Sequence, residues 1–70
     1  MAKFIRLHIQ GEDMFANIDR VLSVHKDLSS DEKNHGRAVV TFGGIDYFHP
    51  DESVEEIMRM IEEKENGNQH

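Results

Sequence analysis

Five histidines in a chain of 70 residues are the side chains best suited to bind a metal or to move a proton. His8, His25 and His49 lie in segments expected to be β-strands, where two or three of them could converge across a sheet. His35 lies in a polar stretch and His70 at the last position. No pair has the spacing of a zinc motif such as H-E-x-x-H. We therefore expect ordinary surface histidines, no metal site and no cofactor.

Basic side chains offer a second chemistry, the binding of an anion. Those on or beside the expected strands are Lys3, Arg6, His8, Arg20, His25 and Arg37. If one sheet face brings them together at an interface between copies of the chain, they could hold a small anionic ligand such as a nucleotide phosphate. The candidate ligand-binding residues are therefore Arg6, His8, His25 and Arg37. Each of them taken singly is an ordinary surface charge.

The polar stretch 27–36 carries oxygen ligands at positions that resemble part of a calcium-binding loop. Asp27, Ser29 and Asp31 occupy the first, third and fifth positions of that pattern. Glu32 stands where the pattern needs a glycine, and Ala38 stands where it needs a bidentate glutamate. The match fails, and we expect a solvated, mobile loop.

Ser53 lies close in sequence to His49 and Asp51, which invites comparison with a nucleophile and its base. No G-x-S-x-G turn surrounds it. Ser53 and Glu56 instead have the spacing of a helix capping box. This role accounts for the serine, so the chain offers no catalytic residues and we expect a protein that is not an enzyme.

Length and charge restrict the possible functions further. Seventy residues predict a single small domain, here residues 1–65, followed by a frayed tail over 66–70. A formal net charge of −6 argues against a nucleic acid partner. No apolar stretch has the length of a membrane span. The chain has no cysteine, which is compatible with a cytoplasmic location.

The elements that must position these residues can be read from the pattern of apolar side chains. Alternating or β-rich segments predict strands at 3–9, 14–16, 20–26, 37–42 and 45–49. Gly43 and Gly44 predict a tight hairpin turn. From Ser53 onward, Val54, Ile57, Met58 and Ile61 form one apolar stripe at helical spacing, and Asn66-Gly67 predicts the stop. We expect an α+β fold, in which a small antiparallel β-meander of four to five strands packs one C-terminal helix on one face.

One helix cannot cover both faces of such a sheet. The apolar residues expected on the second face are Phe4, Val21, Val39 and Phe48, and Met60 lies off the main helix stripe. A half-apolar open face on a chain this small favours a homo-oligomer or a protein partner, and we take these five residues as the candidate interface. The alternative is that they are scattered apolar side chains of an ordinary surface.

Four segments together resemble the small bacterial FlbD/SwrD-like flagellar proteins and their uncharacterised phage or mobile-element relatives. They are residues 4–7, 14–24, 40–48 and 52–57, which include an Asn-x-Asp turn and a Glu-Ser-Val-Glu-Glu helix start. The loop at 27–36 is longer than that family pattern. The resemblance implies a non-catalytic role and supplies no catalytic residues.

Three functions remain open from the sequence, of which a metal-dependent enzyme is the least favoured. The first is a non-enzymatic regulatory or adaptor protein that acts by oligomerising and binding another protein. The second is a phage-type anti-defence protein, which would either sequester a signalling nucleotide between subunits or inhibit a defence protein directly.

Overall fold

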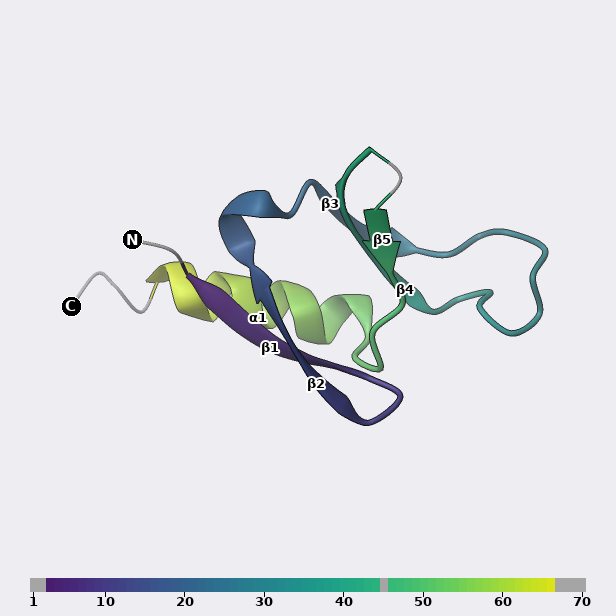
Figure 1. The fold of residues 1–70 in the computed structure, drawn as a ribbon, viewed down its shortest axis with the longest axis horizontal. Helices are drawn as coiled ribbons and strands as arrows, with labels where there is room; N and C mark the ends of the chain where they lie inside the picture. The colour runs from purple at the N-terminus through teal and green to yellow at the C-terminus, as the bar shows by residue number, and fades with distance from the viewer. Residues whose placement is uncertain (1–2, 45, 67–70) are drawn as a thin grey trace.

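The computed structural model describes residues 3–44 and 46–66, and Figure 1 shows how they are arranged. The first element is a β-hairpin in which β1 (Phe4–Ile9) pairs with β2 (Glu12–Asn17). The turn between them has positive φ at Gln10 (52°) and Gly11 (82°), which closes a two-residue connection. The predicted first strand is confirmed, and the second is longer than predicted.

The alternation predicted for β1 is also confirmed. Ile5 and Leu7 are buried in the core, whereas Phe4 and Arg6 are exposed on the outer face of the hairpin. In the register of the hairpin Ile5 lies opposite Ala16, which is also buried, so the two residues lie on the same core-facing side.

The predicted third strand, 20–26, is wrong in its first half. Residues 18–20 form a short 3-10 helix, η1 (Ile18–Arg20), and β3 begins only at Ser23 (Ser23–Lys26). The Asn17 side chain accepts a hydrogen bond from the Asp19 backbone N–H at 3.0 Å, which starts the turn. The turn leaves Val21 packed against the core, although the sequence placed it on the open second face, and leaves Leu22 72% exposed.

A three-stranded antiparallel sheet follows, in the order β3-β4-β5. It contains β4 (Ala38–Gly43) and β5 (Asp46–Phe48). Gly43 and Gly44 both have positive φ, 104° and 59°, as the predicted turn requires. The predicted strand 45–49 is shorter than expected, and its residue 45 lies outside the described residues.

Helix α1 (Val54–Asn66) begins where the capping box predicts. The Glu56 N–H donates to Ser53 Oγ and the Ser53 N–H donates to Glu56 Oε1, each at 3.1 Å. Ile57 is fully buried, but Met58 is 40% exposed although the predicted stripe included it. Met60 packs against the core in its place. Asn66, placed in the predicted tail, is the last helical residue; the rest of that tail lies outside the described residues.

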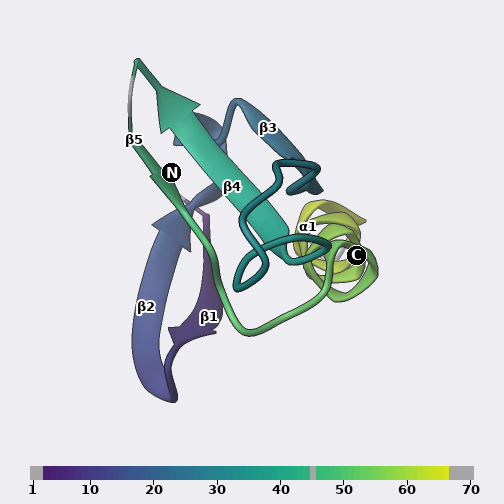
Figure 2. The ribbon, with the colours of Figure 1, turned by 90° about the vertical axis from the view of Figure 1, so that its right-hand side faces the viewer.

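The predicted α+β fold is thus present, with its five strands divided between a hairpin and a three-stranded sheet. Figure 2, turned by 90°, separates the hairpin, the sheet and the helix. Side chains from all three meet in one core, whose buried residues are Ile5, Leu7, Ala16, Ala38, Val40 and Ile57. Within residues 3–44 and 46–66, no helix has the length and apolar character needed to span a membrane.

Val39 corrects the expectation of an open second face. It is only 7% exposed, although it points away from the face on which Val40 joins the core. Side chains from β3, from the loop after it and from the end of β5 share the hollow above Val39, among them His25, Leu28 and His49. The chain's own loop and strands therefore cover the position that the sequence assigned to a partner.

Candidate functional site

An open groove of about 720 Å³ runs between β1 and α1. Phe4, Arg6 and His8 line it from β1, and Met60 and Lys64 are among the helix residues that line its other side. Figure 1 shows the reason: α1 runs back alongside β1, so that the start of β1 and the end of α1 lie at the same end of the molecule. The groove combines apolar floor residues with charges of both signs.

The groove exposes backbone groups as well as side chains, because β1 is an edge strand. The Ile18 N–H donates to the Lys3 carbonyl at 2.9 Å. Lys3 and Ile18, which lie opposite each other, therefore form a hydrogen-bonded pair of the antiparallel ladder. Bonded pairs alternate along an antiparallel ladder, so the N–H and C=O groups of Phe4, Arg6 and His8 point away from β2. They point toward the groove.

At His8 that edge is already occupied by the chain itself. The His8 N–H donates to Glu52 Oε1 at 2.9 Å, and the His8 carbonyl accepts from the Asp51 N–H at 2.6 Å. Residues 51–52 therefore make the hydrogen bonds to His8 that a neighbouring strand would otherwise make. At Phe4 and Arg6, the structure shows no such partner for the outward backbone groups among the described residues.

The side chains at the His8 end form a charged cluster. His8 Nδ1 lies 2.6 Å from Glu52 Oε2, and His8 Nε2 lies 3.1 Å from Asp13 Oδ1. The hydrogen bond with Glu52 raises the pKa of His8 above its ordinary value, with support from the negative charges of both carboxylates. Burial raises the pKa of Glu52, but the bonds from His8 outweigh it, and the net shift is downward.

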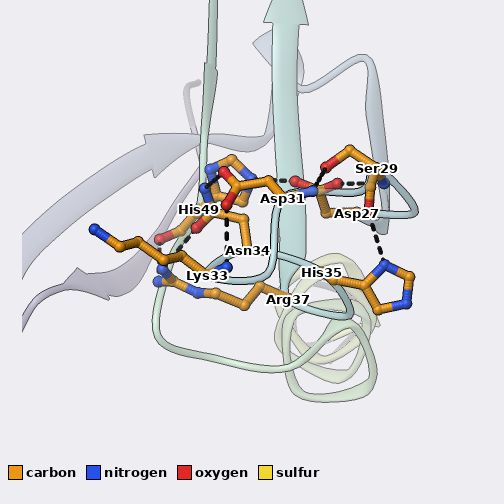
Figure 3. Close-up of polar contacts among 8 residues, drawn as sticks. All are labelled: Asp27, Ser29, Asp31, Lys33, Asn34, His35, Arg37 and His49. Atoms are coloured by element: carbon orange, nitrogen blue, oxygen red, sulfur yellow. Dashed lines mark hydrogen bonds and ion pairs between the residues drawn. The ribbon is translucent and has the colours of Figure 1, made fainter.

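A second cluster fastens the loop 27–36 to the end of β5 (Figure 3). His49 Nε2 lies 2.8 Å from Asp27 Oδ2, and both side chains are largely buried. Arg37 donates to Asn34 Oδ1 at 3.1 Å and to the His49 carbonyl at 2.9 Å. The loop is therefore tied at both ends, where the sequence predicted only a solvated, mobile stretch.

Within the loop, the oxygen ligands that resembled a calcium site are used to form turns. Asp27 Oδ1 accepts from the Ser29 N–H at 2.8 Å, and Asp31 Oδ1 accepts from the Lys33 N–H at 3.0 Å. Hydrogen bonds from Ser29, side chain and backbone, together with the bond from His49, lower the pKa of Asp27 to about 2. In the part of the chain that the structure describes, no three His, Cys, Asp or Glu side chains are grouped as a metal ion would need.

The His49–Asp27 pair has the geometry in which a carboxylate orients a histidine to act as a base. Among the described residues, no hydroxyl group is hydrogen-bonded to His49. Ser53 is held by Glu56 as a helix cap. Within the described residues, the pair therefore joins the loop to the end of β5, and no nucleophile is bonded to it.

The predicted ligand-binding residues lie in three places. Arg6 and His8 line the groove, His25 lies beside Val39 on the other sheet, and Arg37 belongs to the loop cluster. One protomer therefore does not bring them together. Sequence reasoning missed Glu52 and Asp51, because their partners lie about forty positions away in the chain.

The predicted interface residues are divided as well. Phe4, 47% exposed, and Met60 both line the groove. Phe48 lies outside it on β5, where its ring meets Phe42 edge-on at 5.5 Å. Val21 is partly buried against the core, and Val39 is buried, so Val39 is not open to a partner.

Comparison with known proteins adds no further identification: no family model, no curated protein and no solved structure matches the chain.

Proposed function

We propose that this chain is a non-enzymatic adaptor or regulatory protein that works by self-association and by binding another protein. The observation that supports it best is the open edge of β1 at Phe4 and Arg6, beside a groove with an apolar floor. Exposed strand edges add a further strand readily, because each unpaired N–H and C=O group gains a partner.

The composition supports the same class. Seventy residues form a small core, and such domains often gain stability from a partner subunit. The formal charge of −6 suits a basic protein partner better than nucleic acid. The absence of cysteine is compatible with the cytoplasm, where we place the protein. The resemblance to FlbD/SwrD-like proteins implies a non-catalytic role of this kind.

The nucleotide-sequestering alternative has less support. It requires a cluster of cationic side chains, but Arg6 and His8, His25, and Arg37 lie in three separate places. Arg37 is also engaged by Asn34 and the His49 carbonyl, and lies 3.9 Å from Asp51 Oδ1. A phosphate would have to displace these contacts.

Proline substitution at the strand edge tests the proposal. Proline is tolerated where the lost N–H points away from the ladder, so Arg6→Pro should preserve β1–β2 pairing while removing a donor from the open edge. Asp13→Pro is the matched control, because its N–H points out from the opposite edge, on β2. Arg6→Ala removes the same side chain and keeps the N–H.

Sedimentation velocity and circular dichroism provide the readout. We expect the wild type, Asp13→Pro and Arg6→Ala to contain dimers at micromolar concentration, and Arg6→Pro to be a folded monomer. A wild type that stays monomeric at every concentration, or a folded Arg6→Pro that dimerises unchanged, would overturn self-association through this edge.

A further inference from the structure

The open part of the β1 edge is closed at its turn end by the chain itself. At one end, residues 51–52 occupy the outward backbone groups of His8. At the other end the described residues begin at Lys3, whose carbonyl bonds to Ile18 on the β2 side. The outward-facing residues described before His8 are Phe4 and Arg6, with Ile5 midway between them.

We infer that this edge pairs with the same edge of a second copy, antiparallel, with Phe4 opposite the partner's Arg6 around a two-fold axis at Ile5. The inference rests on the proposed self-association and adds to it the partner strand and its register. An antiparallel pair of identical strands is self-complementary, and a two-fold axis is the usual symmetry of dimers.

The closed turn end excludes registers that are shifted toward the turn. With Ile5 on the axis, both outward-facing residues of each copy meet outward-facing residues of the other, and each of these pairs exchanges both backbone hydrogen bonds. Sliding by two residues toward the turn would place Phe4 opposite the partner's His8, where residues 51–52 already lie. It would also place Arg6 opposite the partner's Arg6, and like charges directly opposite destabilise a sheet.

The outer face of the hairpin becomes complementary in this register. Arg6 already lies opposite Phe15 within its own hairpin, and Phe15 is 63% exposed. Pairing places the partner's Phe4 on the other side of Arg6. The guanidinium then lies between two aromatic side chains, an arrangement that favours attraction between the cation and the ring faces. The exposed Phe4 of each copy thereby gains the partner's Arg6 as a neighbour.

The helix residues that line the groove are also complementary to those of the partner when the second copy is related by the two-fold axis at Ile5. Met60 lines the groove, as Ile5 does, and Glu56 and Lys64 lie four positions before and after it. A two-fold axis near Ile5 and Met60 makes the two helices antiparallel. It brings Glu56 of one copy toward the partner's Lys64, so opposite charges approach in both directions.

The edge of β2 does not offer the same match. Glu12 and Asp13 lie at its turn end, and Asp13 already pairs with His8. A charged edge of this kind discourages the addition of another strand. The β1 edge, by contrast, carries an aromatic and a basic residue that complement each other across a two-fold axis.

Single cysteine variants can report the register, because the chain has no cysteine of its own. Phe4→Cys and Arg6→Cys would be oxidised separately and as an equal mixture, and the disulfide products identified by intact mass. Opposed residues in a hydrogen-bonded pair have Cα atoms about 5.5 Å apart, which a disulfide can span. Diagonal neighbours are roughly 7–8 Å apart, which is too far without movement of the backbone.

We expect the mixed Phe4→Cys/Arg6→Cys dimer to dominate, at least tenfold over either homodimer. An excess of Phe4→Cys homodimer or of Arg6→Cys homodimer would show a different register and overturn this inference, while the proposed self-association would stand if Arg6→Pro still gave a monomer. If the wild type sediments as a dimer but the cysteine variants form no disulfide, alone or mixed, another surface is used. A wild type that is monomeric would overturn the proposed function as well.

Discussion

His8 connects three parts of the molecule that are distant in sequence. Its ring lies between Glu52, at the start of the helix, and Asp13, on the neighbouring strand. Its backbone groups bond to residues 51–52, which fixes where the open edge of β1 ends. A single residue thus sets both a local charge pair and the length of the proposed interface.

The shifted pKa values predict a maximum in stability near pH 5 to 6. The pKa of His8 is raised above 6.5 in the fold, so its contribution is complete below that value and is lost as the pH rises through the raised pKa. The pKa of Asp27 falls from 3.8 to about 2, so its contribution is present above 3.8 and is lost as the pH falls toward 2. Urea unfolding measured at intervals from pH 3 to 8 checks both sides.

Glu52→Gln is the control for the alkaline side. Without the carboxylate, the pKa of His8 returns toward 6.5 and the decline in stability between pH 6 and 8 should shrink, while the part of the acid-side decline that comes from Asp27 remains. An unchanged alkaline decline in Glu52→Gln would contradict the assignment to this pair.

Val39 yields a second prediction at this scale. Because Val39 is buried, Val39→Asp should unfold the chain, since an unpaired charge would lose its water. Phe4→Asp is the matched variant on the exposed outer face, and it should keep the fold while reducing self-association. Circular dichroism and sedimentation distinguish the two, and a folded monomeric Val39→Asp would show that this face is an interface after all.

Among the elements, the helix depends most visibly on its first turn. Ser53 and Glu56 satisfy each other's backbone N–H groups before the helix proper begins. Ile57 then enters the core one residue later. The cap therefore positions the one helix residue that is fully buried.

Removal of the cap should lower stability by an amount typical of such sites. Ser53→Ala is expected to cost about 1 kcal/mol, with a fall of roughly 4–8 °C in melting temperature for a domain of this size. Ser30→Ala is the matched control, because Ser30 is exposed and makes no hydrogen bond among those the structure describes. Equal melting temperatures for the two variants would argue against the capping role.

The elements also show what the sequence could predict. The Gly43-Gly44 turn, the capping box and the alternation of β1 depend on neighbours within a few positions, and all three were predictable. The turn at Asn17–Asp19 was predictable from its side chains, but its continuation as a 3-10 helix through Arg20, which delays β3 to Ser23, was not. The covering of Val39 and the bonds of residues 51–52 to β1 depend on contacts between distant segments, which periodicity does not report.

At the scale of the whole molecule, a small core and an elongated shape leave much surface exposed. The described chain measures 44 × 23 × 20 Å, and its core has six buried residues. A partner subunit that covers the β1 edge would add buried surface that one copy lacks.

Dimerisation of this kind makes stability depend on concentration. Melting temperature should rise with protein concentration for the wild type, by mass action, and should be constant for Arg6→Pro. Scanning both proteins over a hundredfold range of concentration provides the measurement. A constant melting temperature for the wild type would indicate that folding and association are not linked.

The bonds between residues 51–52 and His8 have a consequence for how far assembly can grow. An uninterrupted edge would accept strands at several offsets and could extend into a fibre. Here the chain closes its own edge beyond Leu7, and the two-fold pair that we propose uses Phe4 and Arg6 of both copies at once. In that dimer, association through this edge is self-limiting, and a change that frees Asp51 and Glu52 from β1 should favour aggregation.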